Sequence, residues 1–72
     1  DTDVNQTEVK YYSGLNLFKM NQTNYAINKF KAVQEDEDPI LSPLAAMYSG
    51  ISFSQMKKYA DAKQAFQSVL DT

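Results

Sequence analysis

Hydrophobic and polar positions follow a helical period along most of this chain. Over residues 24–35, Ala26, Ile27, Phe30 and Val33 recur at spacings of three and four, which places them on one face of a helix. Apolar spacing and end signals predict further helices over about residues 6–20, 43–56 and 59–70. No useful length alternates with the period of two that half-buried strands show. The pattern predicts an all-α chain of four helices.

The first predicted helix has recognisable signals at both ends. Asn5 is a good N-cap residue, and Glu8 stands at the third helical position, as in a capping box. Val4 and Val9 occupy the two positions of a hydrophobic staple. At the other end, Asn21 can adopt the left-handed conformation that terminates a helix.

The remaining helix boundaries are predicted from hydroxyl residues, proline and charge. Thr23 is a plausible cap for the second helix, and Ser42 followed by Pro43 predicts an N-cap and first residue for the third. The acidic run over residues 35–38 precedes Pro39 and opposes the helix dipole at a C-terminus, which favours a solvated turn there.

The chain also repeats itself. Shifting it by 36 residues places the Tyr-Ser-Gly of residues 12–14 on the Tyr-Ser-Gly of residues 48–50. Four more identities fall in this register: Met20 with Met56, Ala26 with Ala62, Phe30 with Phe66, and Val33 with Val69. Two copies of one two-helix unit therefore account for the whole length.

Small and aromatic residues at fixed positions give this unit its resemblance to a known family. They are Gly14, Leu17, Ala26, Phe30 and Val33 in the first copy, and Gly50, Phe53, Tyr59, Ala62, Phe66 and Val69 in the second. The pattern resembles the tetratricopeptide repeat (TPR). The resemblance implies one domain over residues 1–72, with repeats at about residues 5–38 and 42–72. It also implies four antiparallel helices in two hairpins, forming a short right-handed solenoid.

The chain departs from the family pattern in three places. Lys10 and Ala46 occupy a position where the family has an aromatic residue, the proline at the end of the unit is displaced to Pro39, and the period is 36 where 34 is usual. The longer unit and its loop over residues 38–43 resemble repeats of bacterial cell-envelope assembly proteins. That likeness favours a periplasmic or envelope location over the cytoplasm.

In this family the first helices of successive repeats line a concave groove that binds peptides. The resemblance places ten residues of this chain in that groove: Tyr11, Tyr12, Leu15, Phe18, Lys19, Leu44, Met47, Tyr48, Ile51 and Gln55. Tyrosine and methionine offer large, adaptable contact areas, so the surface is expected to bind a protein or peptide partner. Two alternatives remain: these residues pack against a further repeat or capping helix as a structural segment, or they mediate self-association.

One family function is not expected. Family members that clamp a C-terminal carboxylate use lysine and asparagine at positions where this chain has Tyr11 and Leu15. Without cations there, a bound carboxylate would be desolvated and unpaired.

Composition narrows the function further. The net charge of -2 disfavours nucleic-acid binding, and the absence of His and Cys removes imidazole and thiolate as catalysts or metal ligands. No nucleophile with a plausible base, carboxylate pair on an apolar face or Gly-rich phosphate loop is found, so no enzyme, metal or cofactor is expected. Residues 39–56 carry no charge, but the prolines, the glycine and the serines there argue against a membrane span. The sequons at Asn5 and Asn21 matter only in a eukaryotic secretory context.

Two packing expectations follow from the repeat. Gly14 and Gly50 are predicted to lie inside helices, close to Ala26 and Ala62 of the paired helix. A C-terminal face formed by Phe53, Met56, Phe66 and Leu70 is predicted to stay partly uncovered, which favours a homo-oligomer through that face.

Overall fold

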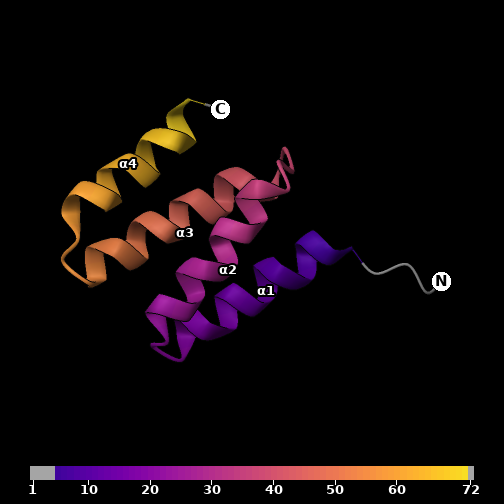
Figure 1. The fold of residues 1–72 in the computed structure, drawn as a ribbon, viewed down its shortest axis with the longest axis horizontal. Coiled ribbons are helices and arrows are strands. Elements are labelled where there is room, and N and C mark those ends of the chain that lie inside the picture. Colours follow the sequence, from indigo (N-terminus) through magenta and orange to yellow (C-terminus); the bar gives the residue numbers. More distant parts are fainter. Residues whose placement is uncertain (1–4, 72) are drawn as a thin grey trace.

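The computed structural model describes residues 5–71, which form four helices. They are α1 (Gln6–Lys19), α2 (Thr23–Glu35), α3 (Leu41–Gln55) and α4 (Tyr59–Leu70). Each helix packs against the next one along the chain, and α1 also touches α3, whereas α2 and α4 do not pack on each other within the described residues (Figure 1). The predicted all-α fold of two helical hairpins is confirmed.

The N-terminus of α1 is capped by Asn5, as predicted. Its side-chain oxygen accepts a hydrogen bond from the Glu8 amide at 3.2 Å, and its Nδ2 donates to Glu8 Oε1 at 3.5 Å. Glu8 thus binds the side chain of Asn5, whereas a capping box would use the Asn5 backbone amide. Val4 lies outside the described residues, so the predicted hydrophobic staple between Val4 and Val9 lies outside them as well.

Left-handed residues end α1 and α3 at equivalent positions. Asn21 has φ 62°, as predicted, and Lys57, 36 residues later, has φ 61°. After each of them the chain bonds back to the preceding helix, with the Gln22 amide donating to the Leu17 carbonyl and the Lys58 amide to the Phe53 carbonyl. The two hairpin turns therefore share one geometry, although asparagine and lysine differ in their tolerance of it.

Two predicted helix caps are wrong. Thr23 is the first residue of α2, and Gln22 precedes it without a side-chain capping bond. Ahead of α3, Asp38 Oδ1 accepts from the amides of Ile40 at 2.9 Å and Leu41 at 2.8 Å. A carboxylate is a stronger acceptor than a serine hydroxyl, so α3 begins at Leu41, before the predicted start.

The hydrophobic core lies where α1, α2 and α3 meet. Its buried members are Tyr11, Ala26, Phe30, Val33 and Ala45. Phe30 is fully enclosed, and its ring stacks on Tyr48 of α3 with 5.7 Å between ring centroids and 20° between planes. The third helix therefore completes the core of the first hairpin.

Gly14 and Gly50 are packing glycines inside helices, as predicted, but they pack against different residues than expected. A Cβ atom on Gly14 would lie 2.7 Å from Cε1 of Phe30, and one on Gly50 would lie 2.5 Å from Cε1 of Phe66. The missing side chain thus makes room for an aromatic ring. Ala26 and Ala62 are not the nearest neighbours.

An ion pair ties the start of α1 to the end of α2. The Lys10 ammonium donates to Asp36 Oδ2 at 2.9 Å, and the Thr7 hydroxyl donates to the same oxygen at 2.8 Å. These two hydrogen bonds, the Lys10 bond first, hold the pKa of Asp36 below its ordinary value. Lys10, which departs from the family pattern, thereby gains a structural role.

Candidate functional site

The residues expected to form a groove lie on α1 and α3, and we call their surface the α1–α3 face. Aromatic rings connect the two helices across it. Tyr12 meets Tyr11 edge-on with 5.4 Å between centroids, Tyr11 meets Tyr48 at 6.3 Å, and Tyr48 meets Phe18 at 5.7 Å. The ring contacts thus link α1 to α3, with Tyr11 and Tyr48 between Tyr12 and Phe18.

Exposure divides the ten predicted residues into three groups. Tyr12, with 59% of its surface exposed, is accessible together with Lys19, Met47 and Gln55. Leu15, Phe18, Leu44, Tyr48 and Ile51 are half-buried. Tyr11 is buried in the core, and burial, together with Tyr48 and Tyr12, raises the pKa of its phenol, so it stays neutral. Tyr11 can support this surface from below but offers a partner little contact area.

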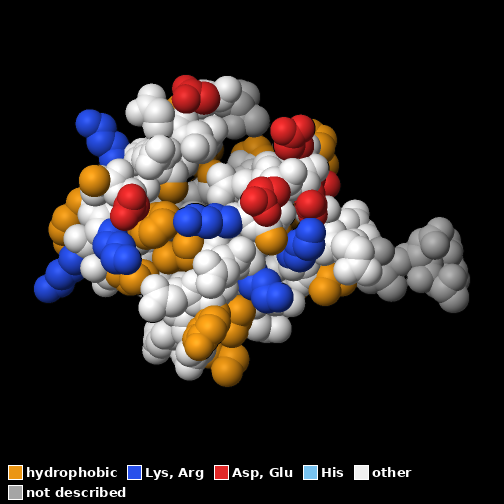
Figure 2. Space-filling view, viewed as in Figure 1, with side chains coloured by type: hydrophobic (Ala, Val, Ile, Leu, Met, Phe, Trp, Pro, Cys, Tyr) orange, Lys and Arg blue, Asp and Glu red, His pale blue; other side chains and the backbone are white. Residues whose placement is uncertain are grey.

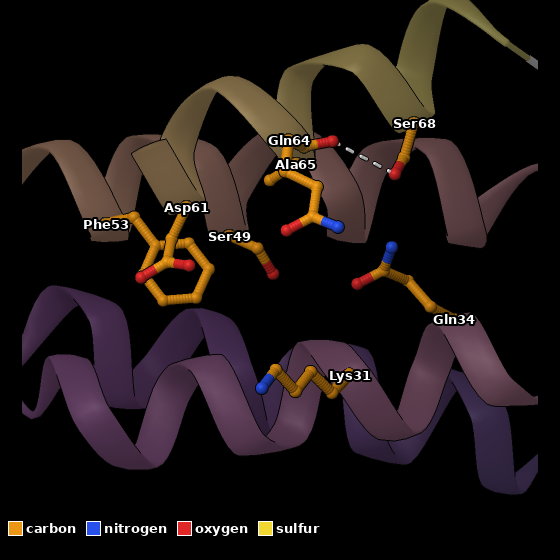
Figure 3. A pocket seen from close by; sticks show the side chains of 8 residues that line it. All are labelled: Lys31, Gln34, Ser49, Phe53, Asp61, Gln64, Ala65 and Ser68. Carbon is orange, nitrogen blue, oxygen red and sulfur yellow. Dashed lines mark hydrogen bonds between the residues drawn. The ribbon is translucent and has the colours of Figure 1, made fainter. Parts of the chain in front are cut away.

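A second surface lies between α2 and α4, with α3 as its floor. A cavity of about 280 Å³ opens there, and Figure 3 shows Lys31 and Gln34 of α2 opposite the side chains of α3 and α4. Its lining also includes Ser49, Phe53, Asp61, Gln64, Ala65 and Ser68. The cavity exists because α2 and α4 are separated by α3 and do not pack together.

Ser49 is the unusual residue of this cavity. It is only 2% exposed, and its hydroxyl has no hydrogen-bond partner among the described residues. A buried hydroxyl without a partner is destabilising. Sequence reasoning missed this position, because Ser49 is one of four serines in α3 and only the packing shows that its hydroxyl has no partner.

Two further cavities lie at the ends of the hairpins. One, of about 260 Å³, is lined by the loop between α2 and α3 and by neighbouring residues such as Ala46. The other, of about 280 Å³, lies beside the turn between α1 and α2, next to Met56. None of these three cavities is lined by any of the ten residues of the α1–α3 face.

The predicted C-terminal face is divided in the structure. Phe66 is 38% exposed and Leu70 is 79% exposed, whereas Phe53 lines the cavity between α2 and α4, and Met56 lies beside Tyr25 near the first turn. Of the four residues predicted to form this face, the two that are exposed are therefore Phe66 and Leu70, both on α4.

Charged side chains of both signs lie on the surface of the described residues. In the view of Figure 2, lysine and acidic side chains are interspersed with apolar ones. Within residues 5–71, no group of three or more acidic residues is arranged to hold a metal ion. None of the helices described has both the length and the apolar character needed to cross a membrane.

The comparison with known families agrees with the repeat. Residues 44–72 match the family model described as tetratricopeptide repeat. The chain contains a TPR-type repeat. The match spans most of α3 and all of α4. The first hairpin has Gly14, Ala26 and Phe30 in the register of Gly50, Ala62 and Phe66. No curated protein and no solved structure matches the chain. TPR repeats generally mediate protein–protein interactions and are typically non-catalytic.

Proposed function

We propose that this chain is a protein-interaction scaffold whose α1–α3 face binds a peptide or helix of a partner protein. The observation that carries the proposal is the exposed ring of Tyr12, continuous with the aromatic contacts that cross to Phe18. Half-buried Leu15 and Ile51 extend this surface on both helices. A partner that covers these side chains removes apolar area from water without disturbing the core.

The binding energy should be mainly apolar. Lys19 is the only charged residue among the ten proposed contact residues, so long-range attraction contributes little and salt should weaken binding only slightly. A few aromatic side chains dominate interfaces of this kind, and Tyr12 is the strongest candidate here because it is both large and accessible.

Tyr12→Ala is the cleanest test of this proposal. A peptide selected on the immobilised chain from a random display library serves as the probe, and calorimetry measures its affinity. We expect Tyr12→Ala to weaken binding by more than about fivefold while leaving the thermal midpoint nearly unchanged. Tyr25→Ala is the matched control, because Tyr25 is similarly exposed, at 63%, but lies on α2.

Tyr48→Ala is less informative by itself. The Tyr48 ring stacks on buried Phe30, so its removal should lower stability whether or not the face binds a partner. Selected peptides whose affinity is the same for the parent chain and for Tyr12→Ala would argue against the α1–α3 face. They would favour the structural alternative, in which these residues serve only a longer solenoid or a self-associating module.

A further inference from the structure

Two of the cavities form one groove. Gln34 of α2 and Ser68 of α4 line both the cavity of about 280 Å³ beside Ser49 and the cavity of about 260 Å³ at the loop between α2 and α3. The floor is one stripe of α3, whose residues recur at spacings of three and four: Ser42, Ala46, Ser49 and Phe53. We call this surface the α2–α4 groove. It includes none of the ten residues of the α1–α3 face.

The groove lies on the polar side of α4, where Gln64 and Ser68 line it. Each residue of a helix is turned by about 100° from the one before, which places Phe66 and Leu70 on the opposite side of α4. An element that covered Phe66 and Leu70 would therefore leave the groove open.

Hydrogen-bonding groups without partners point into the groove. In Figure 3 the Ser49 hydroxyl and the side-chain amides of Gln34 and Gln64 project toward the same space. The Ser49 hydroxyl is buried without a partner, and within residues 5–71 neither glutamine side chain forms a hydrogen bond. A hydroxyl and a side-chain amide can each donate and accept. A ligand that offers both donors and acceptors along its length can therefore bond to all three.

An extended peptide backbone has this property, because its N–H and C=O groups are free to bond outward. An α-helix bonds these groups internally and would leave the three side chains without backbone partners. From Ser42 to Phe53 the floor is about 16 Å long at the α-helical rise of about 1.5 Å per residue. An extended chain covers that length in about five residues.

Charge differs along the groove. Glu37 and Asp38 line one end, and no lysine is among the residues that line that cavity. At the other end, Lys31 and Asp61 contribute one charge of each sign. The acidic end is therefore complementary to a basic side chain, and the other end has no net charge to balance.

We infer that the α2–α4 groove binds an extended segment of a partner protein, about five residues long, with a basic side chain at the end marked by Glu37. The backbone of the segment bonds to the amides of Gln34 and Gln64, and one of its carbonyls accepts from the Ser49 hydroxyl. The buried hydroxyl, which destabilises the free chain, thus gains a partner in the complex.

A library of acetylated, amidated pentapeptides with arginine at the first or last position supplies the probe. The whole chain is labelled and screened against it, and the strongest binders are measured by fluorescence anisotropy. We expect saturable binding that weakens at least about threefold when salt is raised from about 50 to about 500 mM. If no pentapeptide binds saturably at concentrations up to about 1 mM, or if binding does not depend on salt, the inference is overturned.

Ser49→Ala is the most informative variant, because stability and affinity should move in opposite directions. It should raise the thermal midpoint, and it should weaken the selected peptides about three- to tenfold because the complex loses a hydrogen bond. Gln34→Ala should weaken them by a similar factor, and Ser13→Ala, the equivalent change in the first hairpin, should not. An affinity that Ser49→Ala leaves unchanged would show that the hydroxyl bonds only to water and would overturn the inference.

Glu37→Lys tests the acidic end of the groove. The backbone at Glu37 is left-handed, with φ 55°, and Lys57 adopts the same conformation, so lysine is tolerated there. We expect this variant to weaken the peptides at least about fivefold and to reduce their salt dependence. Glu35→Lys makes the same change in net charge outside the groove and should have a much smaller effect. Equal losses would indicate general attraction between charges and would overturn the inference.

Tyr12→Ala keeps this site distinct from the α1–α3 face. It should leave the affinity of the pentapeptides unchanged, since Tyr12 lines neither cavity of the groove. Weaker binding with Tyr12→Ala but not with Gln34→Ala would place the pentapeptides on the α1–α3 face and overturn the inference. Failure of the α1–α3 face to bind its own selected peptides would leave these expectations for the groove as they are.

Discussion

The two hairpins of this chain share their key residues but differ in how completely those residues are buried. Phe30 and Phe66 occupy equivalent positions, yet Phe30 has no exposed surface and Phe66 is 38% exposed. The difference arises because α3 covers α2, while no described helix covers α4. In a linear repeat, therefore, how deeply a residue is buried depends on the next unit as much as on its own unit.

The hairpins also differ in how their ends are tied. In the first, Lys10 and Thr7 of α1 bind Asp36 directly after α2. In the second, the positions equivalent to Thr7 and Lys10 are Pro43 and Ala46, which have no side-chain donor. The first hairpin thus has both a more complete core and a polar cluster formed by Thr7, Lys10 and Asp36. We call this cluster the polar tie.

Replacing the two phenylalanines should give the largest contrast. We expect Phe30→Ala to lower the free energy of unfolding by about 3–5 kcal/mol, since it leaves a cavity in the core. Phe66→Ala should lower it by only about 1–2 kcal/mol, because 38% of the Phe66 surface is already exposed to water. Urea unfolding followed by circular dichroism measures both. Phe30→Leu is the substitute if Phe30→Ala does not fold, and equal losses at the two positions would refute the contrast.

Replacing each of the two glycines by alanine should give the second largest difference in stability between the hairpins. Alanine gains about 1 kcal/mol in helix propensity over glycine at either position. At Gly14 the new Cβ meets a ring that is enclosed and stacked, so strain should outweigh this gain and Gly14→Ala should destabilise by about 1–3 kcal/mol. At Gly50 the Phe66 ring can move toward solvent, so Gly50→Ala should be nearly neutral. The same thermal midpoint for both variants would contradict this expectation.

Removing the hydroxyl of Ser49 should raise stability. Its oxygen is buried without a hydrogen-bond partner, so Ser49→Ala relieves a penalty of about 1 kcal/mol. Ser13→Ala is the matched control in the first hairpin, where the equivalent serine is half-buried, and it should change little. A lower thermal midpoint for Ser49→Ala would show that this hydroxyl has a partner in solution.

The smallest effect should be the pH dependence of the polar tie. The pKa of Asp36 is lower in the folded chain than in the unfolded one, so the carboxylate stabilises the fold above its unfolded pKa of about 3.8. This contribution is lost as the pH falls through the folded pKa. We expect Asp36→Asn to lower the thermal midpoint slightly at neutral pH and to reduce its fall in acid. A midpoint that falls equally in both proteins would show that the tie contributes nothing.

Much of the fold could be predicted from sequence because it depends on local patterns. The spacing of Ala26, Phe30 and Val33 predicts α2. The same residues recur 36 positions later and predict α4. Helix starts were less predictable, because Ser42 and Asp38 both resemble caps and only the three-dimensional path shows which one faces the free amides.

The surfaces were harder to predict. The family resemblance places Tyr11 and Tyr12 together on the candidate face, but only packing shows that Tyr11 is buried and Tyr12 is accessible. The cavity beside Ser49 depends on the distance between α2 and α4, which are far apart in sequence. No local pattern encodes that distance.

Amide hydrogen exchange tests the difference between the hairpins most directly. Amides in α2 should exchange only through global unfolding, because α2 is covered by both α1 and α3. Amides in α4 should exchange through local opening with a free energy clearly below the global value. Equal protection in α2 and α4, both at the global value, would contradict the account and show that α4 is as firmly held as α2.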